Sequence, residues 1–282
     1  GKFEEAQPLY ERSQAIREKV LGPEHPDVAS SLNNRAGLLK AQGDYAGAEP
    51  LYRRAQEIFE TSFGPDHPHV ATAISDRARL LVSQVRARRC FELLRDASRR
   101  KCSSEVLDLI LTKIQLCRAF HDCVQGKYAE AEPLYERCQA IHEKALGPEH
   151  PHVATTLNNR AGLLKKQGKY DDAEPLYVRA ITIGEKALGP EHPDLAVWLN
   201  NRAGLLRAQG KYDEADPLYL RAIEIGEKTL GPDHPSVATR LNNRARLLSM
   251  CCSAFLGKYT EAEPLYARAT EILEKALGPE HP

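Results

Sequence analysis

LNNRAGLLKKQGKYDDAEPLYVRAITIGEKALGPEHP, residues 157–193, is the unit from which most of this chain is built. Its copies align on a short turn that starts with a glycine, and the aligned glycines are Gly1, Gly43, Gly126, Gly168, Gly210 and Gly257. The period is therefore 42 residues, although one interval holds almost two periods. A fixed period of this length indicates an array of small units, each of which buries its apolar face only by stacking on neighbours.

Each unit predicts two antiparallel helices. The first, called helix A below, has apolar residues such as Leu157 and Leu164 at helical spacing and ends before Gly168. The second, helix B, has a longer apolar stripe that includes Tyr177. Gly189 suits the left-handed position after a helix end, and the prolines of the following loop suit the start of the next helix.

The unit resembles a tetratricopeptide repeat in the long form found in kinesin light chains and in arrays fused to NB-ARC ATPase domains. The family pattern appears as Leu157, Arg160, Ala161 and Leu164 in helix A, then Ala173 and Tyr177 in helix B. The resemblance implies an all-α fold, an α-solenoid in which antiparallel helix pairs follow a right-handed superhelix.

Arg160 departs from the family pattern, which usually has an apolar residue at this position. The arginine recurs in other units as Arg35, Arg77, Arg202 and Arg244. Because an unpaired buried charge is costly, we expect its stem to pack and its guanidinium to pair with a helix B carboxylate such as Glu174, rather than to bind a ligand.

The repeats divide the chain into a single array over residues 1–282, with a leading half unit and six helix pairs. The predicted boundaries are 1–25 for a lone helix B, then 26–67, 68–109, 110–150, 151–192, 193–234 and 235–282. We expect a degenerate helix B in 68–109, a degenerate helix A in 110–150, a loop near residues 102–104, and a short insertion at 249–256. An unrelated hairpin inserted at residues 85–125 is the alternative.

Composition argues against several classes of function. The 282 residues contain 39 Lys and Arg against 39 Asp and Glu, so no net field attracts nucleic acid or an acidic membrane. No apolar stretch approaches the length of a spanning helix. We expect a cytoplasmic protein that contacts neither nucleic acid nor membrane, and the start in mid-unit suggests a piece of a longer chain. Residues 86–101 are basic, and we interpret them as a solvated helix face.

Metal and catalytic chemistry find no support in the sequence. Six of the seven cysteines lie in the two irregular segments without the paired spacing of a zinc site, so we expect free thiols and no metal. The histidine of the GPEHP loop recurs once per unit, which favours a structural role for it. No nucleophile motif or phosphate-binding loop is present, so we expect no enzymatic activity and no cofactor.

The pattern that suggests recognition is a pair of asparagines in the middle of helix A. Asparagine is a mediocre helix former, so its repetition there points to a use for the side chain. By the resemblance, helix A lines a concave groove that these residues face, together with Lys and Arg residues in the same register. The candidate groove residues are Asn33, Asn34, Lys40, Arg79, Asn158, Asn159, Lys165, Asn200, Asn201, Arg207, Asn242, Asn243 and Arg246.

Two uses of the asparagines stay open at this point. Their carboxamides can bond to the backbone of an extended peptide, or they can tie adjacent units together. The first use makes the chain a protein-interaction scaffold that binds an extended, acidic peptide or partner protein in the groove. The alternative function is a sensor or regulatory arm of a larger NB-ARC-type nucleotide-binding protein.

Overall fold

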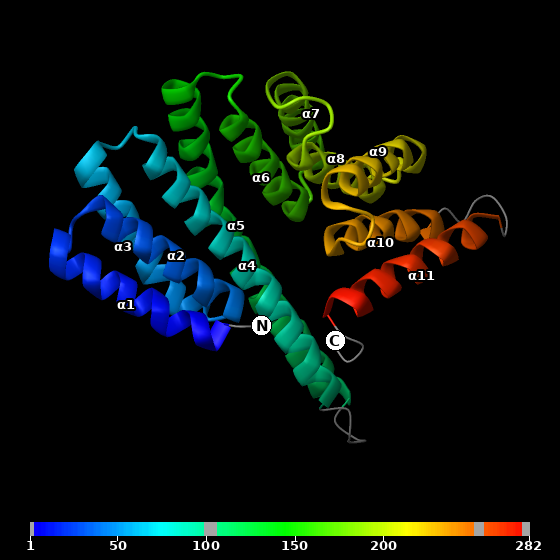
Figure 1. Ribbon diagram of the computed structural model, residues 1–282. Helices are drawn as coiled ribbons and strands as arrows, with labels where there is room; N and C mark the ends of the chain where they lie inside the picture. The colour runs from blue at the N-terminus through cyan, green and yellow to red at the C-terminus, as the bar shows by residue number, and fades with distance from the viewer. Residues whose placement is uncertain (1–2, 99–105, 251–256, 278–282) are drawn as a thin grey trace. The chain divides into compact units, whose positions relative to one another are not determined.

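The computed structural model is helical throughout the part of the chain that it describes. It gives the backbone of residues 3–98, 106–250 and 257–277, and the side chains of residues 5–84, 126–250 and 260–276. These ranges hold eleven helices (Figure 1), with the bounds α1 Phe3–Leu21, α2 Pro26–Gln42, α3 Tyr45–Phe63, α4 Pro68–Ser98, α5 Val106–Leu146, α6 Pro151–Gln167, α7 Tyr170–Ala187, α8 Pro193–Ala208, α9 Tyr212–Leu230, α10 Pro235–Met250 and α11 Gly257–Leu277.

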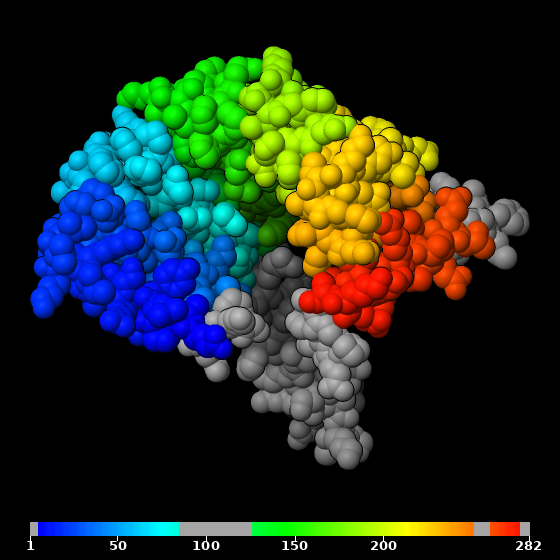
Figure 2. All heavy atoms as spheres, viewed as in Figure 1, coloured from blue at the N-terminus to red at the C-terminus, as the bar shows by residue number. Residues whose placement is uncertain are grey.

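The chain divides into two compact units, Gly1–Pro148 and Glu149–Pro282, called unit 1 and unit 2 below. Within each unit, every helix packs on the helix that follows it in the chain. In unit 2, α8 also contacts α6 and α10 directly, so successive A helices lie next to one another. Figure 2 shows the side chains of α9, α10 and α11 packed against one another. Stacked helix pairs of this kind confirm the predicted all-α solenoid class.

Both ends of the A helices are capped by residues of the repeat. Gly43 after α2 has a φ of 86°, and its N–H donates to the carbonyl of Lys40. Glycine adopts this left-handed conformation without the steric cost that a side chain brings. At the start of α8, His192 Nδ1 accepts a hydrogen bond of 3.2 Å from the backbone N–H of Asp194. Such a cap satisfies one of the N–H groups that have no partner within the helix.

The histidine cap recurs in every loop whose side chains are described. The equivalent acceptors are His25, His67, His150 and His234. The structural role that the sequence predicts for the loop histidine is therefore confirmed at these positions, and His281 lies outside the described residues.

Residues 68–150 depart from the predicted arrangement of two helix pairs. The structure has one long pair there, α4 and α5, which run side by side (Figure 1). Residues 85–125 contain neither glycine nor proline, so nothing ends α4 near Gln84 as Gly43 ends α2. α5 continues through Gly126, since one glycine inside a helix costs only about 1 kcal/mol.

The number of helix pairs changes accordingly. Within the described ranges, α1 is followed by five helix pairs rather than the six that the sequence predicts. The loop expected near residues 102–104 and most of the insertion 249–256 lie outside the described residues. The boundary between the two degenerate repeats at residue 110 stays a prediction.

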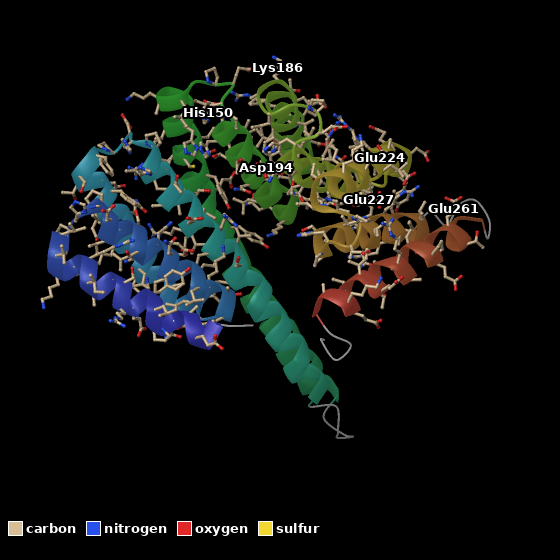
Figure 3. All side chains as sticks on the ribbon, in the orientation of Figure 1. His150, Lys186, Asp194, Glu224, Glu227 and Glu261 are labelled. Atoms are coloured by element: carbon tan, nitrogen blue, oxygen red, sulfur yellow. The ribbon has the colours of Figure 1, made fainter. Side chains whose placement is uncertain are left out.

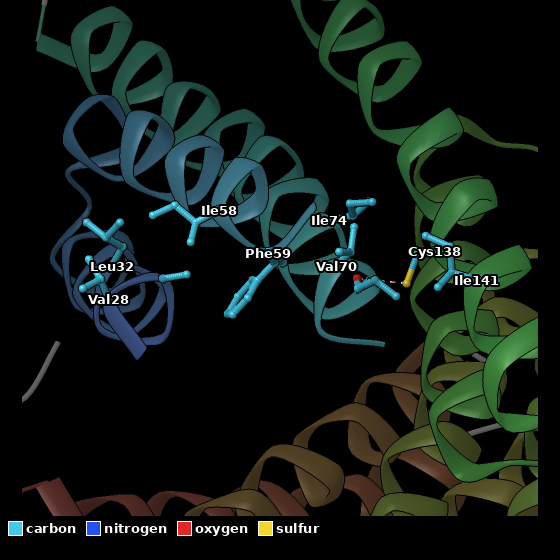
Figure 4. Packing of buried hydrophobic residues seen from close by; sticks show 12 residues of the cluster. Val28, Leu32, Ile58, Phe59, Val70, Ile74, Cys138 and Ile141 are labelled. Atoms are coloured by element: carbon cyan, nitrogen blue, oxygen red, sulfur yellow. Dashed lines mark hydrogen bonds between the residues drawn. The ribbon is translucent and has the colours of Figure 1, made fainter. Parts of the chain in front are cut away.

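A continuous apolar core joins the helices of unit 1. Leu32 of α2, Ile58 of α3 and Ile74 of α4 are all at most 1% exposed and belong to one cluster (Figure 4). The same cluster reaches Cys138 of α5, whose thiol donates to the carbonyl of Ala71 at 3.3 Å. Because α3 is covered by α2 on one side and by α4 on the other, its apolar face is buried only when successive pairs stack.

Candidate functional site

The asparagine pairs form a ladder of hydrogen bonds between neighbouring A helices. Asn201 Nδ2 on α8 donates to Asn158 Oδ1 on α6 at 3.0 Å. Asn243 Nδ2 on α10 donates to Asn200 Oδ1 on α8 at the same distance. The second asparagine of each pair thus binds the first asparagine of the preceding pair. The side chains tie successive repeats together, which is one of the two uses that the sequence left open.

In unit 1 an aspartate changes the direction of the same contact. Asp76 of α4 takes the position that Asn243 has in α10, and its Oδ2 accepts a hydrogen bond of 2.8 Å from Asn33 Nδ2. A carboxylate has no proton to donate, so the asparagine must be the donor. The ladder therefore tolerates either residue, but aspartate adds a negative charge to the helix A face.

The asparagines outside the ladder differ in exposure. Asn34 is exposed, and Asn242 is partly exposed; neither has a hydrogen-bond partner among the described side chains. Asn158 is 6% exposed and donates to Asn159 Oδ1 at 3.4 Å. The asparagines with hydrogen-bond partners within the fold are Asn33, Asn158, Asn159, Asn200, Asn201 and Asn243.

The recurrent arginine of helix A pairs with a carboxylate, as predicted, but across the boundary between repeats. Arg202 of α8 donates to Glu174 Oε1 of α7 through Nε at 2.9 Å and Nη2 at 2.7 Å. Arg244 of α10 makes the same contact with Asp216 of α9, through Nε at 2.8 Å. The sequence predicts Glu174 as the partner of Arg160 in the same repeat, whereas in the structure Glu174 pairs with Arg202 of the next repeat.

Four of the predicted groove residues line one pocket of about 410 Å³ in unit 1: Asn33, Asn34, Lys40 and Arg79. Tyr52 of α3 and Asp76 also line it. Arg79 Nη1 lies 3.4 Å from Asp76 Oδ1. Burial and the charge of Arg79 lower the pKa of Lys40, whereas the Asp76 carboxylate opposes them. Asp76 therefore compensates the cations of this pocket from within the fold.

The same constellation recurs in unit 2 without the carboxylate. In the repeat register, Lys40 corresponds to Arg207 and Tyr52 to Tyr219. Arg79 corresponds to Arg246, and Asp76 to Asn243. Burial raises the pKa of Tyr219, and Arg207 opposes the shift through its charge and through a side-chain hydrogen bond to the tyrosine. Arg246 contributes a further positive charge near the same hydroxyl.

Lys165 of α6 adds a third cation to this part of unit 2. An added Cβ on Gly204 of α8 would lie 2.6 Å from Lys165 Nζ and 3.4 Å from the Tyr219 hydroxyl, so both groups converge over this glycine. Burial lowers the pKa of Lys165 to about 8, helped by the charges of Arg207 and Lys166. No carboxylate among the described residues of unit 2 pairs with Lys165, Arg207 or Arg246. We call Lys165, Arg207, Tyr219 and Arg246 the cationic cluster.

The remaining polar atoms of the cluster also lack acidic partners. Arg207 Nε is buried without a hydrogen-bond partner, and Nη1 of the same residue lies 3.4 Å from Met250 Sδ. Residues 251–259 contain no Asp or Glu, so they supply no compensating charge. Among the described residues, no carboxylate compensates the charge of the cationic cluster.

Two cations outside the helix A face, Lys186 and Arg268, have ion-pair partners, in contrast to Lys165. Lys186 at the end of α7 contacts Glu149 at 3.2 Å, next to His150 (Figure 3). Glu227 of α9, also labelled there, pairs with Arg268 of α11 at 2.7 Å. These exposed pairs are solvated and each adds little to stability.

The repeat register predicts the cations but not the groups around them. The helix B tyrosines belong to the predicted apolar stripe, yet their hydroxyls reach the helix A face beside Gly37, Gly162 and Gly204. The signal available was the recurrence of glycine in helix A opposite the helix B tyrosine. Asp76 stands where other repeats have an asparagine, and its role in charge compensation is visible only in the structure.

The sequence model of the tetratricopeptide repeat matches residues 1–61, 27–102, 111–186, 152–225 and 194–251, and a second model with the same description matches residues 237–282. The chain belongs to the tetratricopeptide-repeat family. Tetratricopeptide repeats generally mediate protein–protein interactions and generally serve as non-catalytic scaffolds. A comparison with curated protein sequences gave no significant match.

Solved tetratricopeptide structures share the fold of this array. The crystal structure of BtubC (BKLC) from P. vanneervenii has a TM-score of 0.64 and 20% identity, covering 100% of this chain and 92% of that chain. Nearly identical TPR-like repeats of a Podosopora anserina protein described as a kinesin light chain give a TM-score of 0.59 and 22% identity, covering 90% of this chain and 98% of that chain. A substituted form of those repeats has a TM-score of 0.60 and 22% identity, covering 89% of this chain and 97% of that chain. The array is therefore similar to kinesin-light-chain-like repeats.

The described part of the array offers neither a metal site nor a membrane span. No group of three or more His, Cys, Asp or Glu side chains there is placed to hold a metal ion. None of its helices combines the length and the apolar character needed to cross a bilayer. Cys138 is a buried free thiol, and the other six cysteines lie outside the described side chains.

Proposed function

We propose that the array binds an extended, acidic segment of a partner protein along the A helices of unit 2. The observation that carries the proposal is the cationic cluster, in which Lys165, Arg207 and Arg246 come from three successive A helices and have no carboxylate partner among the described residues. A partly buried cation without a counter-charge is unfavourable, and the lowered pKa of Lys165 reflects that cost. A carboxylate from a partner relieves it.

The spacing of the A helices supports an extended ligand. α6, α8 and α10 contact one another in sequence, and packed helices lie about 8 to 10 Å apart. An extended chain advances about 3.3 Å per residue, so neighbouring A helices correspond to about every third residue of the ligand. A Glu at every third position therefore places one carboxylate at each A helix, and the middle one lies where Lys165 and Tyr219 converge over Gly204 of α8. The alternative, a regulatory arm of an NB-ARC-type protein, stays a prediction.

Binding of peptide pools tests the proposal directly. The probe is a fluorescein-labelled nine-residue pool with Glu at every third position and Gly, Ala or Ser elsewhere, compared with pools carrying Gln or Lys instead. We expect the Glu pool alone to bind, and its affinity to fall as salt rises, because the contacts are ionic. Lys165→Met with Arg207→Gln should abolish binding, whereas Lys186→Gln with Lys228→Gln, on the loop side, should not. Equal retention of the Glu and Gln pools contradicts the proposal.

A further inference from the structure

The two units carry the same constellation with different internal charges. In unit 1, the cations Lys40 and Arg79 face the Asp76 carboxylate beside the Tyr52 hydroxyl. In unit 2, Asn243 replaces the aspartate and uses its amide to bind Asn200. In unit 1, therefore, the protein itself supplies the counter-charge, because a carboxylate oxygen of Asp76 lies within reach of Arg79.

The charge at the unit 2 site is larger as well as uncompensated. Two cations and one carboxylate leave a single positive charge in unit 1, whereas three cations leave three positive charges in unit 2. A single carboxylate from a ligand still leaves two positive charges at the unit 2 site. A phosphate monoester carries a charge of about −1.5 to −2 at neutral pH, which brings the unit 2 site close to the residual charge of unit 1.

The donors of the cluster also match a phosphate group. A phosphoryl group presents three strong acceptor oxygens, which arginine side chains bind well and lysine binds as a point charge. The cluster offers the guanidinium of Arg207, the ammonium of Lys165 and the charge of Arg246 around the Tyr219 hydroxyl. These donors come from four helices of one unit, α6, α8, α9 and α10, so they form a built site rather than a charge run on one helix.

We infer that the cationic cluster of unit 2 is a receptor for a phosphorylated side chain within the extended partner segment. The inference rests on the proposed function and narrows it: acidic residues bind along the A helices, and one phosphate group occupies the position between Lys165, Arg207 and Arg246. Asp76 fills the corresponding position in unit 1, so that unit does not take the phosphate. Binding of the partner is thereby made dependent on its phosphorylation.

The first test compares two ligands that differ at one position. In the nine-residue Glu pool defined above, the central Glu is replaced by phosphoserine. We expect the phosphoserine pool to bind about tenfold more tightly than the Glu pool at the same ionic strength, as stronger charge-assisted hydrogen bonds would give. Inorganic phosphate is added as a competitor, and we expect it to displace the phosphoserine pool only at concentrations far above the peptide's own dissociation constant.

The second test supplies the site with its own carboxylate. Asn243→Asp copies the arrangement of unit 1, in which Asn33 donates to Asp76, so Asn200 can donate to the new aspartate and the ladder is kept. We expect this variant to bind the phosphoserine pool no better than the unchanged array binds the Glu pool. Ser236→Asp is the matched control, because it adds the same charge to α10 at a position where other repeats carry Asp27 or Asp194. It should leave both affinities unchanged.

The outcomes separate this inference from the proposed function. Equal affinity for the phosphoserine and Glu pools overturns the phosphate receptor but leaves the acidic-segment function standing. If neither the phosphoserine pool nor the Glu pool binds, both the phosphate receptor and the acidic-segment function are overturned. An undiminished preference for phosphoserine in Asn243→Asp, in a variant that keeps the far-ultraviolet circular dichroism of the parent, also overturns the assignment of the site. Displacement by inorganic phosphate at the same molar concentration as the peptide shows a site for the free anion and contradicts the peptide assignment.

Discussion

Asn201 Nδ2 donates a 3.0 Å hydrogen bond to Asn158 Oδ1, which joins α8 to α6 at a position where Asn158 is only 6% exposed. Truncation of Asn201 leaves a buried acceptor without a partner. We therefore expect Asn201→Ala to lower the free energy of unfolding of unit 2 by about 0.5 to 1.5 kcal/mol. Trp198 is the only tryptophan of the chain and is buried in unit 2, so its fluorescence during urea unfolding reports this loss.

A double-mutant cycle separates the hydrogen bond from other effects of truncation. In the Asn158→Ala background, Asn201→Ala should cost much less, because its acceptor is already gone. Asn242→Ala is the control, since Asn242 has no hydrogen-bond partner among the described side chains. Additive losses in the cycle would show that the ladder contact contributes no stability.

The contact between Arg202 and Glu174 gives a second prediction. Two nitrogen atoms of the guanidinium contact Glu174 Oε1, and the Glu174 side chain is 23% exposed. We expect Arg202→Met to cost about 1 to 3 kcal/mol, because it leaves a half-buried carboxylate without its hydrogen bonds. Glu174→Gln in the Arg202→Met background should recover part of this loss. Chemical unfolding followed at Trp198 measures both, and a neutral result for Arg202→Met contradicts the structural role of the pair.

Much of the fold follows from the sequence because its signals are local. Gly43 and His192 act on the backbone within a few residues, so the recurrence of GKY and GPEHP is enough to place helix ends. The long pair α4 and α5 could not be predicted in the same way. Residues 85–125 lack glycine and proline, and the turns that the repeat register predicts near Gln84 and at Gly126 are replaced by continuous helix.

The candidate site is less accessible to sequence reasoning because it depends on contacts between repeats. Lys165 and Arg207 were identified from their register, but the convergence of Lys165 and Tyr219 over Gly204 joins three helices. Arg202 was expected to have a partner, yet the choice of Glu174 depends on how one repeat stacks on the next. Periodicity alone does not fix such relationships.

Gly184 of α7 gives a prediction about packing between repeats. The ring of Trp198 on α8 lies so close to Gly184 that an added Cβ would overlap its Cζ3 and Cε3 atoms. We expect Gly184→Ala to lower the free energy of unfolding by about 1 to 3 kcal/mol, as overpacking in a core does. Gly162→Ala is the matched control, because its Cβ would meet only the Tyr177 hydroxyl at 3.5 Å. It should be neutral or stabilising by up to about 1 kcal/mol, since alanine favours a helix over glycine.

Relief of the clash distinguishes packing from backbone effects at Gly184. In the Trp198→Leu background the larger aromatic ring is gone, so Gly184→Ala should lose most of its cost. Thermal unfolding followed by circular dichroism makes the comparison, because the variant lacks the tryptophan. An equal cost in both backgrounds would place the strain in α7 itself.

Lys165 predicts a pH dependence whose sign is set by its lowered pKa. Burial and neighbouring cations bring the pKa to about 8 in the folded protein, from 10.5 in the unfolded chain. Below pH 8 both states are protonated, and the folded state bears the cost of a partly buried charge. Between about pH 8 and 10.5 the unfolded state binds more protons, so the contribution of Lys165 makes the folded state more stable as pH rises.

We expect Lys165→Met to stabilise unit 2 at pH 7 by about 1 kcal/mol, allowing for the partial exposure of the side chain, and to lose this advantage near pH 10.5. Urea unfolding of the variant and the unchanged array at both pH values, with Lys211→Met at an exposed position as control, measures the difference. A stabilisation that is absent at pH 7, or that grows with pH, contradicts the assignment of Lys165 as an uncompensated cation.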